Sequence, residues 1–198
     1  CRVAMAITFL GQKRKKVNIK NLSFIVLILC VVSCKKIDSN GYRVFTIKEG
    51  RHRSNTAYCT TRTNYLSFEA IFDESAQYTT NDPANQYDVN KLYGLSDCGT
   101  SHSKNSIRFG WRWLNDSLEI LWYKREDGDF SFGNITTVDL NTSYYYSITF
   151  TEDLYILAVD GIEVEVSRKC SETYKKYYLY PYFGGDEKAP HNITIRIK

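Results

Sequence analysis

Residues Thr142–Val166 read TSYYYSITFTEDLYILAVDGIEVEV and hold three consecutive strand patterns. Polar and apolar side chains alternate along Tyr144–Thr151. Two shorter apolar runs, Leu154–Val159 and Ile162–Val166, flank the pair Asp160-Gly161. Because an Asp-Gly pair tolerates the positive φ angles of a type I′ turn, these two runs are expected to form a tight hairpin. A period of two residues is typical of strands with one buried face, so the stretch predicts antiparallel β-sheet.

The same period of two residues recurs on both sides of this stretch. It runs through Tyr42–Lys48, Tyr65–Phe72, Ile107–Trp113, Ser117–Lys124, Tyr177–Phe183 and Ile193–Ile197. Short strands with a turn about every ten residues predict an all-β fold, an antiparallel two-sheet β-sandwich. The side chains expected in its core are Phe68, Phe109, Trp111, Leu118, Ile120, Ile148, Phe150, Ile156 and Ile195. We interpret Trp113 and Trp122 as core residues too, because they alternate beside other apolar residues.

The N-terminal residues follow a different pattern. A basic block, Lys13–Lys16, precedes an apolar run from Leu22 to Val32 that ends in Ser33-Cys34. The run of about eleven residues is shorter than the roughly twenty that span a membrane, and it fits the apolar region of a signal peptide; a buried core segment is the alternative. This order resembles the signal peptide and lipobox of a bacterial lipoprotein. The resemblance implies cleavage before Cys34, lipidation of its sulfur and an anchor in the outer membrane of the cell envelope, facing either the periplasm or the outside.

The chain is therefore divided into a signal peptide (1–33), a lipidated cysteine with a polar tether (34–42) and one β-sandwich domain (43–198). The only cations before Cys34 are Arg2, Lys13, Arg14, Lys15, Lys16 and Lys20, and no acidic residue precedes it. The remainder carries 20 basic and 22 acidic residues, a formal charge of −2. Such a domain lacks the basic footprint of nucleic-acid binding, so no nucleic-acid partner is expected.

Three cysteines, Cys59, Cys98 and Cys170, follow the predicted lipidation site. They allow at most one disulfide and leave one thiol over; reduced buried thiols are the default interpretation, and the pairing stays open. No Cys/His spacing indicates zinc. No cofactor is expected, although calcium is an option, for which the oxygen ligands would come from Asp73, Asp82, Asp88 and Asn90 without a fixed-spacing loop.

The succession of segments in Thr142–Val166 resembles the central hairpins of the concanavalin A-like lectin/glucanase and laminin G-like jelly rolls. In those folds a strand of the type Y-x-I-x-F precedes x-L-x-V-D-G, and Ile193–Ile197 stands where they end. The resemblance extends over Tyr65–Lys198 and implies a jelly roll, a fold shared by lectins, hydrolases, lyases and adhesion modules. Asn90–Gly99 and Tyr180–His191 are also similar to segments of uncharacterised Bacteroidota-type lipoproteins.

The motifs of jelly-roll enzymes are missing. Laminarinase-type hydrolases carry E-x-D-x-x-E, whereas Glu163 and Glu165 lack that spacing and are interpreted as a solvated strand face. Alginate-lyase-type proteins carry R-x-E-x-R, Q-[IV]-H and Y-F-K-x-G; residues 182–185 echo only the last, without its lysine. No G-x-S-x-G occurs. No catalytic residue is assigned on this basis.

Three clusters are candidate ligand-binding sites, each with a structural alternative. The loop that begins at Asp97 offers carboxylate, imidazole and amide groups, or is a plain polar loop. The alternating arginines of Ile107–Trp113 suit carboxylate or sulfate groups, or are simply exposed. The Tyr-Pro-Tyr-Phe-Gly-Gly segment offers aromatic rings for sugars, or forms a tight turn around core tyrosines. The candidate residues are Asp97, His102, Asn105, Arg108, Arg112, Tyr182 and Asp186.

The sequence leaves two main classes of function and a third, less specific one. The favoured prediction is a cell-envelope lipoprotein whose jelly roll binds a glycan. The alternative is a polysaccharide-degrading lyase or hydrolase; for a lyase, His102 would be the base and Arg108 or Arg112 the cation that neutralises the substrate. A structural or protein-binding envelope component is the remaining option. The favoured prediction rests on fold analogy, on the N-terminal signal and on the polar and aromatic loops.

Overall fold

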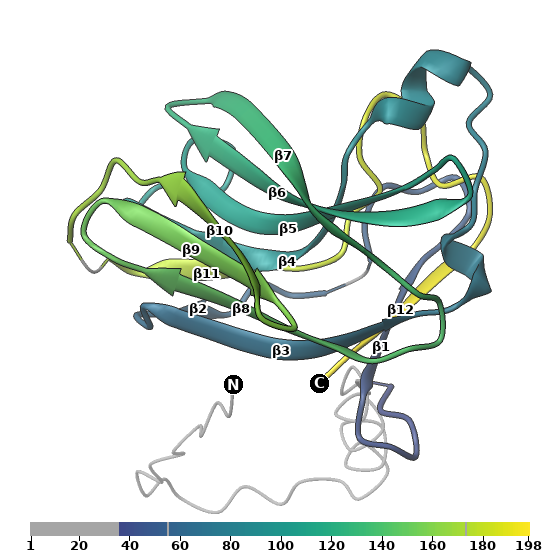
Figure 1. Cartoon of the computed structure of the whole chain (residues 1–198), viewed down its shortest axis with the longest axis horizontal. Helices are drawn as coiled ribbons and strands as arrows, with labels where there is room; N and C mark the ends of the chain where they lie inside the picture. The colour runs from purple at the N-terminus through teal and green to yellow at the C-terminus, as the bar shows by residue number, and fades with distance from the viewer. Residues whose placement is uncertain (1–35, 55, 173) are drawn as a thin grey trace, which may run out of the picture. The chain divides into compact units, whose positions relative to one another are not determined.

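Figure 1 shows the computed structural model of the chain, which describes residues 36–54, 56–172 and 174–198. Lys36–Lys198 forms one compact unit. The predicted signal peptide and lipobox (1–33) and the predicted lipidation site, Cys34, lie outside the described residues. Among the residues described, no helix has the length and apolar character needed to cross a membrane.

The described residues form two antiparallel sheets of six strands each, which confirms the predicted two-sheet β-sandwich (Figure 1). In spatial order, the first sheet consists of β1 (Arg43–Ile47), β12 (Ile193–Ile197), β3 (Tyr65–Phe72), β8 (Tyr144–Phe150), β9 (Leu154–Val159) and β10 (Ile162–Ser167). The second consists of β2 (Thr60–Thr61), β11 (Lys176–Leu179), β4 (Asn90–Ser96), β5 (Ser106–Leu114), β6 (Ser117–Glu126) and β7 (Asp129–Val138). Two short 3-10 helices, η2 (Glu74–Ala76) and η3 (Pro83–Tyr87), lie between β3 and β4 in the chain.

The pairing of β8 with β9 decides which side chains of β9 face the core. Ile148 lies opposite Leu157, and Phe150 lies opposite Tyr155. Cross-strand partners point to the same face, so Tyr155 and Leu157 turn inward and are buried. Ile156, predicted as a core residue, faces outward and is only half-buried. That prediction was wrong because both alternating sets of β9 are apolar, and only the pairing with β8 distinguishes them.

The other predicted core side chains are buried between the sheets. They are Phe68, Phe109, Trp111, Leu118, Ile120, Ile148, Phe150 and Ile195. Trp111 is fully buried, with the rings of Phe72 and Tyr78 at 5.3 and 5.8 Å from its own. Trp113 and Trp122 are half-buried, and both pack against this core. The interpretation of the three tryptophans as core residues is therefore confirmed, with two of them at its margin.

Strands β2, β4 and β7 of the second sheet were not predicted. The strand β7 pairs with β6 across Asp127-Gly128, whose φ angles are 52° and 102°. This is the same Asp-Gly signal that predicted the β9–β10 hairpin, so the sequence did contain a turn signal here. Phe130 and Phe132 alternate with small polar positions along β7, which lies at the edge of its sheet and is mostly exposed.

One disulfide joins Cys98 to Cys170, and Cys59 remains a partly exposed thiol. The expectation of at most one disulfide is confirmed, whereas the default of reduced thiols is wrong for this pair. Cys98 follows β4 of the second sheet and Cys170 follows β10 of the first. The disulfide therefore links the two sheets.

Residues 36–42, which the sequence places in the tether, fold against the first strand. Ile37 forms a β-bridge with Arg43, and Oδ1 of Asp38 accepts a hydrogen bond of 2.9 Å from the backbone N–H of Tyr42. Tyr42 is buried, and its hydroxyl donates to the Glu69 carboxylate at 2.5 Å. These contacts make residues 36–42 part of the packed unit.

Candidate functional site

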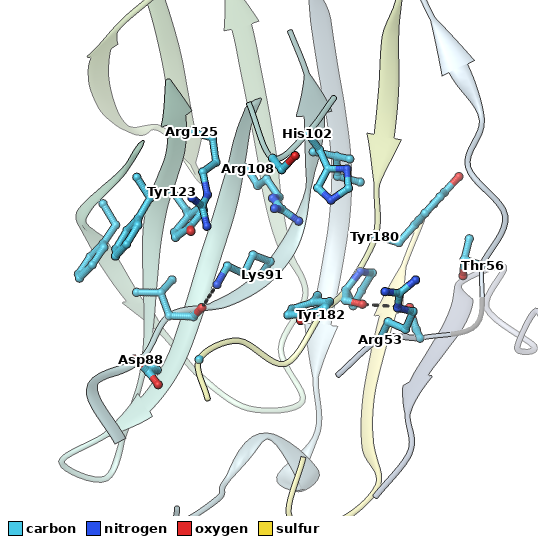
Figure 2. A pocket seen from close by; sticks show the side chains of 18 of the residues that line it. Arg53, Thr56, Asp88, Lys91, His102, Arg108, Tyr123, Arg125, Tyr180 and Tyr182 are labelled. Atoms are coloured by element: carbon cyan, nitrogen blue, oxygen red, sulfur yellow. Dashed lines mark hydrogen bonds between the residues drawn. The ribbon is translucent and has the colours of Figure 1, made fainter. Parts of the chain in front are cut away.

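A pocket of about 1160 Å³ opens on the outer face of the second sheet, the face that points away from the core (Figure 2). Strands β4 to β7 form its floor. Its walls come from two segments: one precedes β2 and contributes Arg53, Ser54, Thr56 and Tyr58, and the other, within residues 180–186, follows β11. The β4–β5 loop contributes His102. The pocket thus gathers side chains from segments that are far apart in the sequence.

Strand pairing aligns the side chains of the floor in one row. Arg108 of β5 lies opposite Tyr123 of β6, and Tyr123 lies opposite Phe132 of β7. In the next pairs of the β6–β7 hairpin, Arg125 lies opposite Phe130. Because paired residues share a face, these side chains project together into the pocket. Phe109 and Trp111, which alternate with Arg108 along β5, point the other way into the core.

Backbone contacts hold residues 180–186 against β4. Lys91 and Tyr182 exchange two backbone hydrogen bonds of 2.8 and 2.9 Å, and the N–H of Gly184 donates to Oδ1 of Asn90 at 2.7 Å. A Cβ at position 184 would lie 2.1 Å from the carbonyl oxygen of Val89, so only glycine fits there. Gly184 therefore allows residues 180–186 to approach the backbone of residues 89–91 closely.

Arg108 is the central cation of the pocket. Its side chain is 8% exposed, and the Nε–H has no hydrogen-bond partner among the described residues. Burial lowers the pKa of Arg108 to about 10, so the guanidinium stays charged at neutral pH. The alternative of simple exposure of Arg108 and Arg112 is wrong, because Arg108 is buried and Arg112 is only partly exposed.

Further cations surround Arg108. Lys91 and Arg125 lie close to it in Figure 2, and Arg53 stands on the far wall. Burial lowers the pKa of Lys91 to about 8, and the charges of Arg108 and Arg125 add to this shift. The acidic residues of the pocket are Asp88 and Asp186. None of these side chains takes part in an ion pair within the described part of the chain.

His102 lies at the upper rim of the pocket in Figure 2, with its ring stacked on that of Tyr58 at 6.0 Å. Burial lowers its pKa, and the cations Arg108, Arg53 and Arg125 lower it further. The imidazole is therefore mainly neutral at pH 7, with one nitrogen able to accept a proton or a hydrogen bond.

Aromatic rings extend from the floor to the edge strand. The rings of Tyr123 and Phe130 are 5.9 Å apart and inclined by 11°, and those of Phe130 and Phe132 are 6.4 Å apart and inclined by 4°. Phe130 is 59% exposed and Phe132 42%. We call Tyr123, Phe130 and Phe132 the aromatic platform. On the other side, Tyr182 stacks on His52 at 5.3 Å.

The structure brings four of the predicted site residues together in this pocket: His102, Arg108, Tyr182 and Asp186. Arg112 lies outside it, where its Nε donates to Glu119 at 2.6 Å and Nη1 donates to the carbonyl of Tyr87. Asn105 is buried and caps the β6–β7 turn through the N–H of Asp127. Both side chains are engaged in contacts that shape the fold.

Asp97 also lies outside the pocket, in a fully buried ion pair. Its carboxylate accepts hydrogen bonds from Nε of Arg168 at 2.7 Å and from the Tyr155 hydroxyl at 2.9 Å, and Nζ of Lys176 is 3.8 Å away. Asp97, Cys98 and Cys170 bring potential ligand atoms together, but the two sulfurs form the disulfide. This group is therefore structural.

The residues considered for calcium do not converge. Asp73 and Asp82 cap the two 3-10 helices, each through a backbone N–H. Asn90 is buried and donates to the hydroxyl of Tyr78 at 2.9 Å. Asp88 lines the pocket beside Gly185. The exposed positions of Glu163 and Glu165 on β10 confirm that they form a solvated face.

Lys91, Tyr123, Arg125, Phe130 and Phe132 are pocket residues that sequence reasoning missed. Tyr123 lay within the predicted strand Ser117–Lys124 without a role in a site, Arg125 lay just beyond that strand, and β7 was not predicted at all. The Asp127-Gly128 turn was the signal that could have placed the two phenylalanines next to Tyr123 and Arg125. No comparable local signal existed for Lys91, because residues 180–186 complete its surroundings.

No protein-family model matches the chain, and no curated protein matches it in sequence. Several solved structures share its fold. Alginate lyase AlyC3 has a TM-score of 0.59 at 13% identity, with 82% of this chain and 75% of that chain covered. The laminarinase catalytic domain from Thermotoga maritima has a TM-score of 0.54 at 14% identity, with 84% and 78% covered. Alginate lyase AlyA1 from Zobellia galactanivorans has a TM-score of 0.51 at 14% identity, with 81% and 76% covered. At these identities the likeness concerns the fold, and it supports the expected concanavalin A-like jelly roll.

Proposed function

We propose that this chain is a glycan-binding protein and that the pocket on the outer face of the second sheet is its binding site. The observation that carries the proposal is the aromatic platform, whose nearly parallel rings run from the buried Tyr123 to the exposed Phe130 and Phe132 at the edge of the pocket. An exposed row of aromatic rings is unfavourable in water unless a ligand covers it. The apolar faces of pyranose rings suit such a surface, and their hydroxyl groups suit the polar side chains further inside.

The size and openness of the pocket agree with a carbohydrate ligand. Its volume of about 1160 Å³ exceeds what one small metabolite fills, so it offers room for several sugar units. Alginate lyase AlyC3 has also been solved with dimannuronate, and its structure in that complex has a TM-score of 0.55 to this chain. That complex supports the proposal by analogy, since a jelly roll of this kind there holds an oligosaccharide.

The proposal includes the location of the protein. The basic, apolar and Ser33-Cys34 order supports export and lipidation, which would present the pocket at the cell envelope. Replacing Cys34 with Ala and fractionating the cells tests this part. The variant is expected to lose its lipid label and its membrane association, and membrane binding equal to that of the unchanged chain would contradict it.

An array of neutral and acidic oligosaccharides tests the binding function, with the purified full chain as the probe. Phe130→Ala is expected to weaken binding by about threefold to tenfold, because one ring of the platform is lost. Tyr145→Ala is the matched control, since Tyr145 is a 46% exposed aromatic residue on the first sheet. Failure to bind any glycan, or equal losses in the two variants, would overturn the proposal. Incubation with the same oligosaccharides tests the enzyme alternative, because a lyase releases unsaturated products that absorb ultraviolet light.

A further inference from the structure

Building on the proposed glycan-binding function, we infer that the pocket selects sugars that carry an anionic group, a carboxylate or a sulfate, and that Arg108 binds this group. Neither the fold nor the aromatic platform requires a charged ligand. The inference rests on the charges inside the pocket and on how they are paired.

The first step is the missing partner of Arg108. A buried charge is normally paired, because desolvation of an isolated ion is strongly unfavourable. Arg108 is more than nine-tenths buried, yet it forms no ion pair, and its Nε–H has no acceptor among the described residues. The ring of Tyr123 lies 5.8 Å from the guanidinium carbon of Arg108, which is a cation–π contact and supplies no counter-charge. An anionic ligand would supply the missing acceptor.

The second step is the charge balance of the pocket. The residues that follow the predicted signal peptide have a small formal negative charge, −2. The pocket departs from this balance, since Arg53, Lys91, Arg108 and Arg125 line it with only Asp88 and Asp186 as acidic residues. Arg108 and Arg125 are close enough to disfavour the charge of Lys91, and Arg125 also disfavours that of Arg108. An anion placed among them would relieve this repulsion.

The third step is the geometry of the donors. The guanidinium of Arg108 presents a planar fork that matches two oxygens of a carboxylate or a sulfate. Figure 2 shows it between Arg125 and His102 and above Lys91, and Tyr123, the buried member of the aromatic platform, lies opposite Arg108 on the neighbouring strand. A sugar stacked on the platform would therefore have its neighbouring unit next to Arg108. Uronic acids and sulfated sugars carry such a group.

Matched oligosaccharides test the inference. The full chain is titrated with a uronic-acid tetrasaccharide and its carboxyl-reduced form, and with a sulfated tetrasaccharide and its desulfated form. At least one anionic member is expected to bind about tenfold or more tightly than its neutral counterpart, the size expected for a charge-assisted hydrogen bond. Loss of affinity on carboxyl reduction assigns the group as a carboxylate, and loss on desulfation assigns it as a sulfate.

Two variants of the same strand locate the selectivity. Arg108→Gln is expected to bind the anionic and neutral members within about twofold of each other. Arg112→Gln is the control, because Arg112 lies on the same face of β5, outside the pocket and paired with Glu119, and it should keep the selectivity of the unchanged chain. Thermal unfolding confirms that both variants fold.

Equal affinity of the unchanged chain for both members of each pair would overturn the inference while leaving glycan binding intact. Undiminished selectivity in Arg108→Gln would overturn the role of Arg108. Absence of binding to every glycan would instead count against the proposed function itself.

Discussion

Arg168 and Arg108 are both buried arginines, with exposures of 6% and 8%, yet their surroundings are opposite. Arg168 directs its guanidinium at the carboxylate of Asp97 and at two carbonyl groups. Burial alone would lower the pKa of Arg168, but the hydrogen bonds to Asp97 and its charge outweigh burial and raise it. At Arg108 burial lowers the pKa, and no carboxylate compensates.

The difference separates a group that stabilises the fold from a group that is set up for a ligand. The Asp97 group joins a segment after β4 to a segment after β10, next to the disulfide, and it lies entirely inside the protein. The Arg108 group lines a pocket that opens to solvent. A protein can retain an unpaired buried cation when a bound anion supplies its counter-charge. The cation then lowers the free energy of unfolding of the ligand-free protein, and binding of the anion restores it.

Removing the internal carboxylate should produce the largest effect. Asp97→Asn leaves Arg168 and Lys176 buried without a counter-charge, so we expect the free energy of unfolding to fall by about 3–5 kcal/mol. Urea denaturation at neutral pH measures the change. Asp127→Asn is the control, because Asp127 forms an exposed pair with Lys169, and the substitution should change stability little. A loss at Asp97 no larger than that of the control would show that this ion pair does not stabilise the fold.

The disulfide beside Asp97 should give the next largest effect. The Cys98→Ser, Cys170→Ser double variant opens a covalent loop of 72 residues, and we expect a loss of about 2–4 kcal/mol of unfolding free energy. Cys59→Ser, which removes the free thiol, provides the comparison and should change stability little. Glycan binding should survive in the double variant, since the disulfide lies outside the pocket. Impaired binding in a folded double variant would mean that the two regions are coupled.

The two regions also differ in how far the sequence predicts them. The strand pattern predicted the sandwich and most of its core, because a period of two residues is a local property. The sequence placed both Asp97 and Arg108 in candidate sites, Asp97 as part of a polar loop and Arg108 as one of two alternating arginines on a strand. Their opposite roles depend on partners that are distant in the chain: Arg168 for Asp97, and residues 180–186 for the surface around Arg108. Periodicity does not identify such partners.

Lys91 offers a test that depends on pH. Its pKa is lowered to about 8 by burial and by Arg108 and Arg125, with Asp88 acting in the opposite direction, and the rings of Tyr123 and Tyr182 face it. A bound anion favours the charged form of the Lys91 amine. At pH values where part of this amine is neutral, binding of the anion is therefore coupled to the uptake of a proton by Lys91. The affinity for an acidic oligosaccharide should therefore fall by up to about tenfold as pH rises from about 7 to about 9.

Isothermal titration in buffers of different ionisation enthalpy measures both the affinity and this proton uptake. Lys91→Met should bind more weakly at pH 7 and should show little of the fall. The carboxyl-reduced ligand should show no fall with the unchanged chain. An identical pH dependence in Lys91→Met would assign the titration to another group, and the role of Lys91 would be refuted.

The smallest expected effect has the opposite sign to that of Asp97→Asn. Arg108→Met removes an unpaired buried charge and fills the space with an apolar side chain, so the protein without ligand should gain up to about 1 kcal/mol of unfolding free energy. Arg112→Met, on the same strand, breaks the pair with Glu119 and should lower stability. Denaturation of the two variants side by side, without glycan, measures the difference. If Arg108→Met lost as much stability as Arg112→Met, Arg108 would have a stabilising partner within the protein, and the contrast with Arg168 would no longer hold.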